Sequence, residues 1–63
     1  MLTKQLNLSL IKGDFVINEH TEYGTFYSIK HALTRCLELG AGTVYLDKSL
    51  GTFVWDGGHW VLQ

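Results

Sequence analysis

The sequence predicts an α+β domain of two layers, in which one amphipathic helix covers one face of an antiparallel sheet. Three observations support this class: extended segments with a period of two, one segment with a period near 3.6, and Gly-containing turns between the extended segments. With 63 residues, 46% of them apolar, the chain is expected to form one domain spanning 1–63. The predicted order is β-β-α-β-β-β. An all-β barrel with a short helical plug is the alternative.

The first two extended segments are predicted to form a hairpin. Leu6 to Leu10 alternates between apolar and polar residues, and Phe15 to Asn18 is aromatic and β-branched. Lys12-Gly13-Asp14 is a turn signal. A loop of two residues is favoured because it puts the apolar side chains on one face, namely Leu8, Leu10, Phe15 and Ile17. The polar residues from His20 to Gly24 are predicted to form a connection.

A single helix is predicted from roughly Phe26 to Leu39. Its apolar stripe contains Ile29, Leu33, Cys36, Leu37 and Gly40, with Ala32 at the edge. Ser28 or Thr25 can cap the N-terminus by accepting backbone N–H bonds, and Gly40 occupies the position where a left-handed residue ends a helix.

Three further strands are predicted over 43–47, 52–56 and 59–63. The Gly57-Gly58 turn would pair Trp55 with Trp60 and Val54 with Val61. If the preceding loop places Asp47 opposite Thr52, then Tyr45 faces Val54. The large apolar side chains of these strands share a face that is expected to meet the helix, namely Val44, Leu46, Phe53, Trp55, Trp60 and Leu62.

The opposite face of the sheet is expected to be free, because one helix covers only one side. Tyr45, Val54 and Val61 are predicted to form an apolar row there, with Ile11 and Val16 available from the first hairpin. This row is the first candidate partner-binding surface. β-branched residues also suit strands for purely structural reasons.

Aromatic residues before the helix form a second candidate surface. Tyr23, Phe26 and Tyr27 could anchor a partner, or they could cover the open end of a small core. The unpaired sheet edges are a third candidate, because a partner strand can add to them.

Charge and composition exclude several classes of partner. Five Lys and Arg against six Asp and Glu give a formal net charge of -1, so direct nucleic-acid binding is not expected. No apolar run approaches the roughly 18 residues of a membrane span, and residues 1–5 do not resemble a signal peptide. The lone Cys36 cannot form an internal disulfide. A cytoplasmic protein is therefore expected.

No catalytic or cofactor motif stands out. Cys36 lies on the predicted buried stripe and His31 on another face of the helix, so they are not expected to act as nucleophile and base. Four polar residues could gather round a metal, namely His20, Glu22, Asp56 and His59, but their spacing is not that of a metal motif. We therefore expect neither an enzyme nor a bound metal or cofactor.

The architecture resembles the small inhibitors that bacteriophages make against host machinery, including anti-CRISPR proteins. The segments that carry the resemblance are the helix from Ser28 to Gly40, the strand Gly42–Leu46 and the Gly-punctuated ending through Trp60. The resemblance implies a non-enzymatic protein that binds and inhibits a larger host protein or complex. A structural protein that self-assembles as a homodimer through the apolar row or a sheet edge is the alternative.

Overall fold

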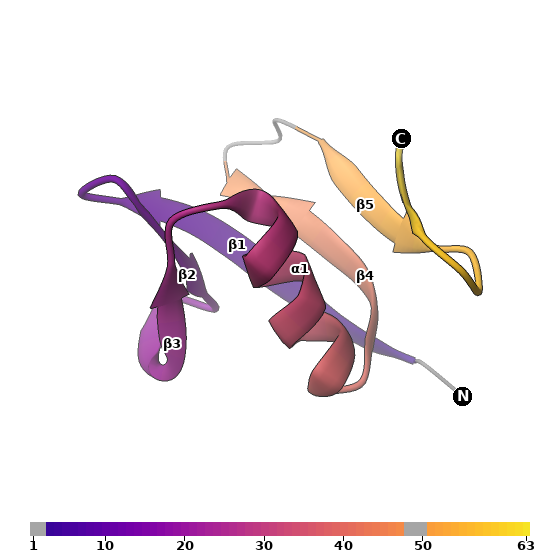
Figure 1. The fold of residues 1–63 in the computed structure, drawn as a ribbon, viewed down its shortest axis with the longest axis horizontal. Helices are drawn as coiled ribbons and strands as arrows, with labels where there is room; N and C mark the ends of the chain where they lie inside the picture. The colour runs from indigo at the N-terminus through magenta and orange to yellow at the C-terminus, as the bar shows by residue number, and fades with distance from the viewer. Residues whose placement is uncertain (1–2, 48–50) are drawn as a thin grey trace.

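Six strands form one mixed sheet, and a single helix packs against one of its faces (Figure 1). The computed structural model describes residues 3–47 and 51–63. The elements are β1 (Lys4–Ile11), β2 (Asp14–Ile17), β3 (His20–Phe26), α1 (Ile29–Glu38), β4 (Ala41–Leu46), β5 (Thr52–Trp55) and β6 (Trp60–Leu62). The α+β class is confirmed. The prediction of a purely antiparallel sheet with five strands is wrong in two respects.

The first difference is the direction of the central pair of strands. The strand order is β3-β2-β1-β4-β5-β6, so two three-stranded meanders meet at β1 and β4. These two strands run parallel, with Leu6 opposite Val44 and Leu8 opposite Leu46. Parallel pairing needs a long crossover, which β2, β3 and α1 provide. Apolar periodicity does not record strand direction, so the pattern could not distinguish the two arrangements.

The first hairpin has the predicted register. Leu8 lies opposite Ile17 and Leu10 opposite Phe15, which leaves Lys12-Gly13 as the two-residue loop. Both loop residues have positive φ angles, 52° and 88°, as a type I′ turn requires. The register puts Leu8, Leu10, Phe15 and Ile17 on the helix side of the sheet, as predicted.

The second difference is strand β3, which occupies residues predicted to be a connection. A second tight turn at Asn18 and Glu19, with φ angles of 51° and 62°, brings His20 opposite Ile17. The β2–β3 register then shifts, so β3 is irregular, and it lies at the sheet edge. An edge strand of this kind lacks the alternation that marks a strand with one buried face. Asn18 could have indicated the turn before β3, because Asn is favoured in type I′ turns.

Asn18 is expected to hold this turn in two ways. Its side-chain Oδ1 accepts a hydrogen bond of 2.9 Å from the backbone N–H of Asn7, and its φ is positive. Asn18→Ala removes the bond and leaves a residue that tolerates positive φ poorly, so the free energy of unfolding should fall by about 1–3 kcal/mol. Asn18→Gly removes only the bond and should cost less, about 0.5–1.5 kcal/mol. Urea unfolding of both variants measures this difference. Equal losses of unfolding free energy would contradict the idea that the positive φ at position 18 disfavours Ala.

Helix α1 begins later than predicted and ends as predicted. Phe26 belongs to β3, where it pairs with Phe15, so the helix starts at Ile29. Ser28 is the N-cap, and its Oγ accepts a hydrogen bond of 3.3 Å from the N–H of His31. Gly40 has a φ of 94° and donates to the carbonyl of Leu37 at 3.0 Å, which ends the helix.

The core lies between α1 and the central strands. Its buried members are Leu6, Leu8, Ile17, Ala32, Leu33, Cys36, Ala41 and Val44. The helix buries the face formed by Ala32, Leu33 and Cys36 and packs against β2, β3 and β4. Ala32 is therefore at the centre of the buried face and not at its edge, whereas Ile29 is only half-buried.

The C-terminal meander has one predicted register and one that differs. In β5 and β6, Trp55 pairs with Trp60 and Val54 with Val61, as predicted. Between β4 and β5 the register is two residues away from the prediction, because Tyr45 lies opposite Thr52. A shift of two residues keeps every side chain on its predicted face. The predicted loop between these strands falls partly on residues 48–50, outside the described residues.

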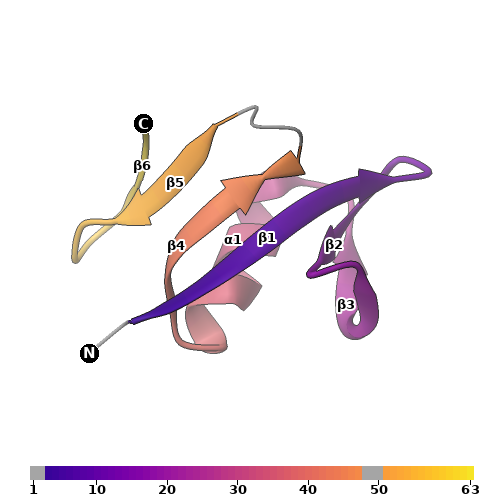
Figure 2. The same cartoon turned by 180° about the vertical axis from the view of Figure 1, so that it is seen from behind.

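We call the side of the sheet away from α1 the reverse face, which is turned toward the viewer in Figure 2. On its β1–β2 half, Ser9 and Val16 are buried within the chain, at 8% and 3% exposure. Val16 is therefore not available to a partner, contrary to expectation. Ile11, at the end of β1, is 42% exposed. Only part of the reverse face is free.

Candidate functional site

The helix is too narrow to cover the sheet. An α-helix with side chains is about 10 Å across, whereas six strands about 4.8 Å apart extend over about 24 Å. Because α1 packs against β2, β3 and β4, the last two strands lie beside it and not beneath it (Figure 1). The helix-facing side chains of β5 and β6 therefore remain partly uncovered.

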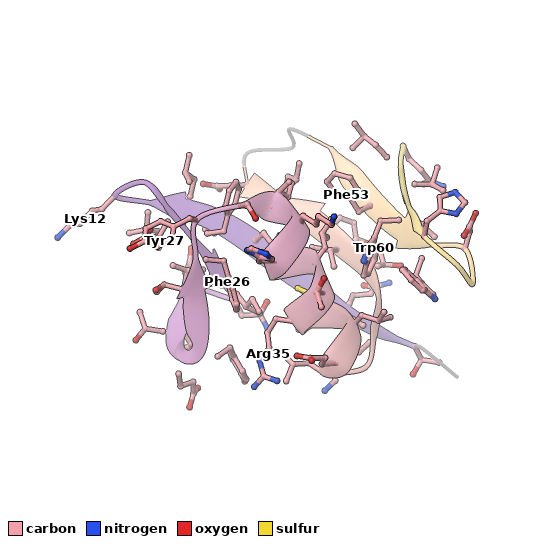
Figure 3. The ribbon with its side chains drawn as sticks, in the orientation of Figure 1. Lys12, Phe26, Tyr27, Arg35, Phe53 and Trp60 are labelled. Carbon is pink, nitrogen blue, oxygen red and sulfur yellow. The ribbon has the colours of Figure 1, made fainter. Side chains whose placement is uncertain are left out.

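A groove of about 380 Å³ runs between α1 and the β5–β6 hairpin. Its apolar lining residues are Ile29, Leu33, Leu37, Phe53, Trp55 and Trp60, and we call this site the groove. The first three recur every four residues along α1 and form one wall. The aromatic residues form the other wall, and Figure 3 shows Phe53 and Trp60 between α1 and β5.

The aromatic wall has a defined geometry. The rings of Trp55 and Trp60 meet edge to face, with centroids 5.4 Å apart and an angle of 66° between their planes. Such pairs are favoured over face-to-face stacking. Phe53 and Trp60 also pack against the core, which connects the wall to the rest of the molecule.

Polar residues occur at the rim of the groove. Lys30, Thr34 and His59 complete the lining, and none of the described residues that line the groove is acidic. Lys30 lies in the first turn of α1, where no acidic side chain offsets the positive end of the helix dipole. The ammonium of Lys30 and the helix N-terminus therefore place positive charge at this end of the groove.

His59 is placed by the turn between β5 and β6. The carboxylate of Asp56 accepts hydrogen bonds from the N–H groups of Gly58 and His59 at 3.2 and 3.1 Å. Its other oxygen lies 3.2 Å from Nε2 of His59. Asp56 and His59 therefore form a polar pair across the turn.

The large apolar side chains of the β5–β6 wall were expected to be covered by the helix, and they are covered only in part. Phe53, Trp55 and Trp60 are half-buried, and the helix does not close over them. A usable signal was the surplus of large apolar side chains over what one short helix can cover. The pattern predicts which side chains share a face, but not how wide the covering layer is.

The predicted row on the reverse face is only partly in register. Val54 and Val61 lie directly opposite each other, with Thr43 next in line. Tyr45 is on the same face but aligns with Thr52, so it is diagonal to Val54. Tyr45 and Val61 are 40% and 38% exposed, and Val54 is half-buried. The structure thus keeps these residues on one surface without forming a continuous row.

The aromatic residues before the helix divide between two positions. Tyr23 and Phe26 pack against the core, in the covering role that was one of their two predicted interpretations. The carbonyl of Tyr23 also accepts a hydrogen bond of 3.4 Å from Nε of Arg35, which connects β3 to α1. Tyr27 is 92% exposed and lies at the same end of the molecule as Lys12 (Figure 3). Tyr27 alone remains available as a surface anchor.

The thiol of Cys36 is fully buried. Burial raises the pKa of this thiol from 9.0 to about 11, because the charged thiolate is penalised away from water. His31 is exposed, on another face of α1. A buried thiol in its neutral form is a poor nucleophile, so the residue packs as a small apolar side chain.

The four polar residues weighed as metal ligands do not converge. His20 and Glu22 belong to β3, whereas Asp56 and His59 flank the turn of the β5–β6 hairpin at the opposite edge of the sheet. Over residues 3–47 and 51–63, no three His, Cys, Asp or Glu side chains are grouped so that they could hold a metal ion. In the same described ranges, no helix has the length and apolar character to cross a membrane.

Comparison with known proteins adds no relative. No protein-family model, curated protein or solved structure matches this chain. Function is therefore argued from the surfaces of the molecule.

Proposed function

We propose that this chain is a non-enzymatic binding module that takes an amphipathic helix of a larger protein into the groove. The observation that carries the proposal is the uncovered apolar wall formed by Phe53, Trp55 and Trp60 beside α1. Contiguous apolar surface with a polar rim is typical of interaction sites. Aromatic side chains are also those that contribute most to binding energy at interfaces.

The dimensions of the sheet favour a helix as the occupant. Packed helices lie 8–10 Å apart, which is about two strand spacings. A second helix beside α1 would therefore lie over β5 and complete the layer that α1 begins. Its apolar stripe would contact Leu33 and Leu37 on one side and the two Trp rings on the other.

The charges at the rim favour an acidic side chain on that helix. Lys30 is the cationic residue among the described lining, and the N-terminal turn of α1 adds partial positive charge there, whereas His59 already lies against the carboxylate of Asp56. A Glu or Asp at the matching end of the partner helix would therefore be attracted there. Complementary charge of this kind fixes the orientation of a docked helix more than its affinity.

An inhibitory role follows from this mode of binding and from the resemblance to small phage-encoded inhibitors. A helix held in the groove is withdrawn from the larger protein's own contacts. Occupancy alone would then block a host protein or complex, with no chemical step.

Affinity capture from lysate of the native host tests the groove against the reverse face. Leu37→Glu places a charge inside the groove at a half-buried position of α1 and should abolish capture of the partner. Tyr45→Glu places the same charge on the reverse face and should leave capture unchanged. Circular dichroism of both variants controls for folding.

Tryptophan fluorescence gives a direct second measurement. The sequence contains two Trp residues and both line the groove, so their emission should shift to the blue when the purified captured protein is added. Capture lost in Tyr45→Glu and kept in Leu37→Glu would move the site to the reverse face. Absence of any retained protein with the folded wild-type chain would contradict the proposed function.

A further inference from the structure

The free edge of β6 is short and apolar. β6 is the last strand in the sheet order, and its residues Trp60, Val61 and Leu62 include no charged residue and no Pro (Figure 2). β6 has only its length of three residues as protection, whereas natural proteins also protect such edges with charges, Pro or bulges. The other edge has these features, because β3 carries Glu22 and an irregular register.

The hydrogen bonds of the hairpin identify the backbone groups that point outward. The N–H of Asp56 donates to the carbonyl of His59 at 3.0 Å, and the N–H of Gln63 donates to the carbonyl of Thr52 at 2.8 Å. Hydrogen-bonded pairs alternate with non-bonded pairs in an antiparallel ladder. Trp60 and Leu62 are therefore in non-bonded pairs, and their N–H and carbonyl groups face away from β5.

The exposed side chains of β6 point to both faces of the sheet. Val61 is 38% exposed on the reverse face, and Leu62 is 59% exposed on the helix side. A partner that docks on one face would cover only one of them. A strand added to the edge would cover both and would also satisfy the outward backbone groups.

We propose that the edge of β6 pairs with the same edge of a second copy of this chain, antiparallel and centred on Val61. In this register Trp60 of each copy lies opposite Leu62 of the other. Each of these two pairs exchanges two backbone hydrogen bonds, which gives four in total. The two Val61 side chains meet across the two-fold axis, with Cα atoms about 4.5 Å apart. No like charges meet, and aromatic–aliphatic pairs form on the helix side.

The strand is self-complementary, which is why a second copy is the expected occupant. Only three residues pair, so the interface is smaller than that of a standard stable complex. The expected dissociation constant is therefore in the range of about 10 μM to 1 mM. This inference rests on the outward backbone groups of β6 and not on an occupant of the groove, although Trp60 belongs to both sites.

Sedimentation velocity from low micromolar to about 1 mM protein tests the pairing. The wild-type chain should shift from a species of 7.1 kDa toward twice that mass. Val61→Lys places two like charges opposite each other and should raise the dissociation constant at least about tenfold. Tyr45→Lys adds the same charge on the same face at matched exposure, 40% against 38%, but on β4, and should leave the dimer unchanged.

A mixture gives the sharpest test of the register. Val61→Lys and Val61→Glu chains should each be monomeric, yet their equimolar mixture should dimerise, because only a residue on the two-fold axis meets itself. Backbone amide exchange should slow with concentration at Trp60 and Leu62 and not at Val61. A wild-type chain that stays monomeric throughout, or a dimer that Tyr45→Lys dissociates and Val61→Lys does not, would overturn the proposal.

Discussion

Leu33→Ala is expected to lower the free energy of unfolding by about 2–5 kcal/mol. Leu33 is 5% exposed and lies on the buried face of α1, so the shortened side chain loses apolar contacts and leaves a cavity in the core. A single core in a chain of this length supplies only about 3–5 kcal/mol in total. The variant should therefore be partly or largely unfolded at 25 °C. Urea unfolding followed by far-UV circular dichroism measures the difference.

Two substitutions make this result specific to burial. Lys30→Ala changes an exposed position of the same helix and should alter stability by no more than about 0.5 kcal/mol. Trp55→Ala removes a larger side chain, but one that is half-buried beside the groove, so it should cost less than Leu33→Ala. Equal unfolding midpoints for wild type and Leu33→Ala would refute the placement of the helix. Low protein concentration keeps self-association out of the measurement.

The second large effect is expected in alkaline solution. The pKa of the Cys36 thiol rises from 9.0 to about 11 on folding, so the folded chain holds this proton more tightly than the unfolded chain. Its contribution to stability is fully present below pH 9 and is lost as the pH rises toward 11. A shift of this size corresponds to a loss of about 3 kcal/mol of stability over that range.

Cys36→Ala isolates this effect from other groups that titrate at high pH. The variant lacks the thiol, so its stability should fall less steeply between pH 9 and 11 than that of the wild type. Chemical unfolding at each pH, with the two proteins in parallel, measures the difference in slope. Identical pH profiles would show that the thiol is not buried in its neutral form.

The parts of the fold that follow from side-chain alternation could be predicted from the sequence. Val44 and Trp55 stay on the helix side and Tyr45 on the reverse face even though the β4–β5 register differs by two residues. The I′ turn at Lys12-Gly13 and the Ser28 cap were also predictable, because each depends on residues close together in the chain. Strand β3 was missed because an irregular edge strand has no single buried face.

The candidate site was predictable in its residue types and not in its form. Alternation places Phe53, Trp55 and Trp60 on the correct face, but it does not show that the helix leaves this face partly uncovered. Whether it is covered depends on where α1 lies across the sheet. That position depends on the parallel pairing of β1 with β4, which no local pattern records.

The amino-acid sequence by itself determined the α+β class, the approximate positions of the helix and of five strands, and the face on which the side chains of these strands lie, because these depend on periodicity and on turn residues a few positions apart. Only the tertiary structure decided the strand order, the direction of β1 relative to β4, the groove beside α1 and the free edge of β6. These features depend on how segments far apart in the chain pack against one another, which local periodicity does not record. A helix about 10 Å wide cannot cover six strands, and where it leaves the sheet open is a property of the packed molecule.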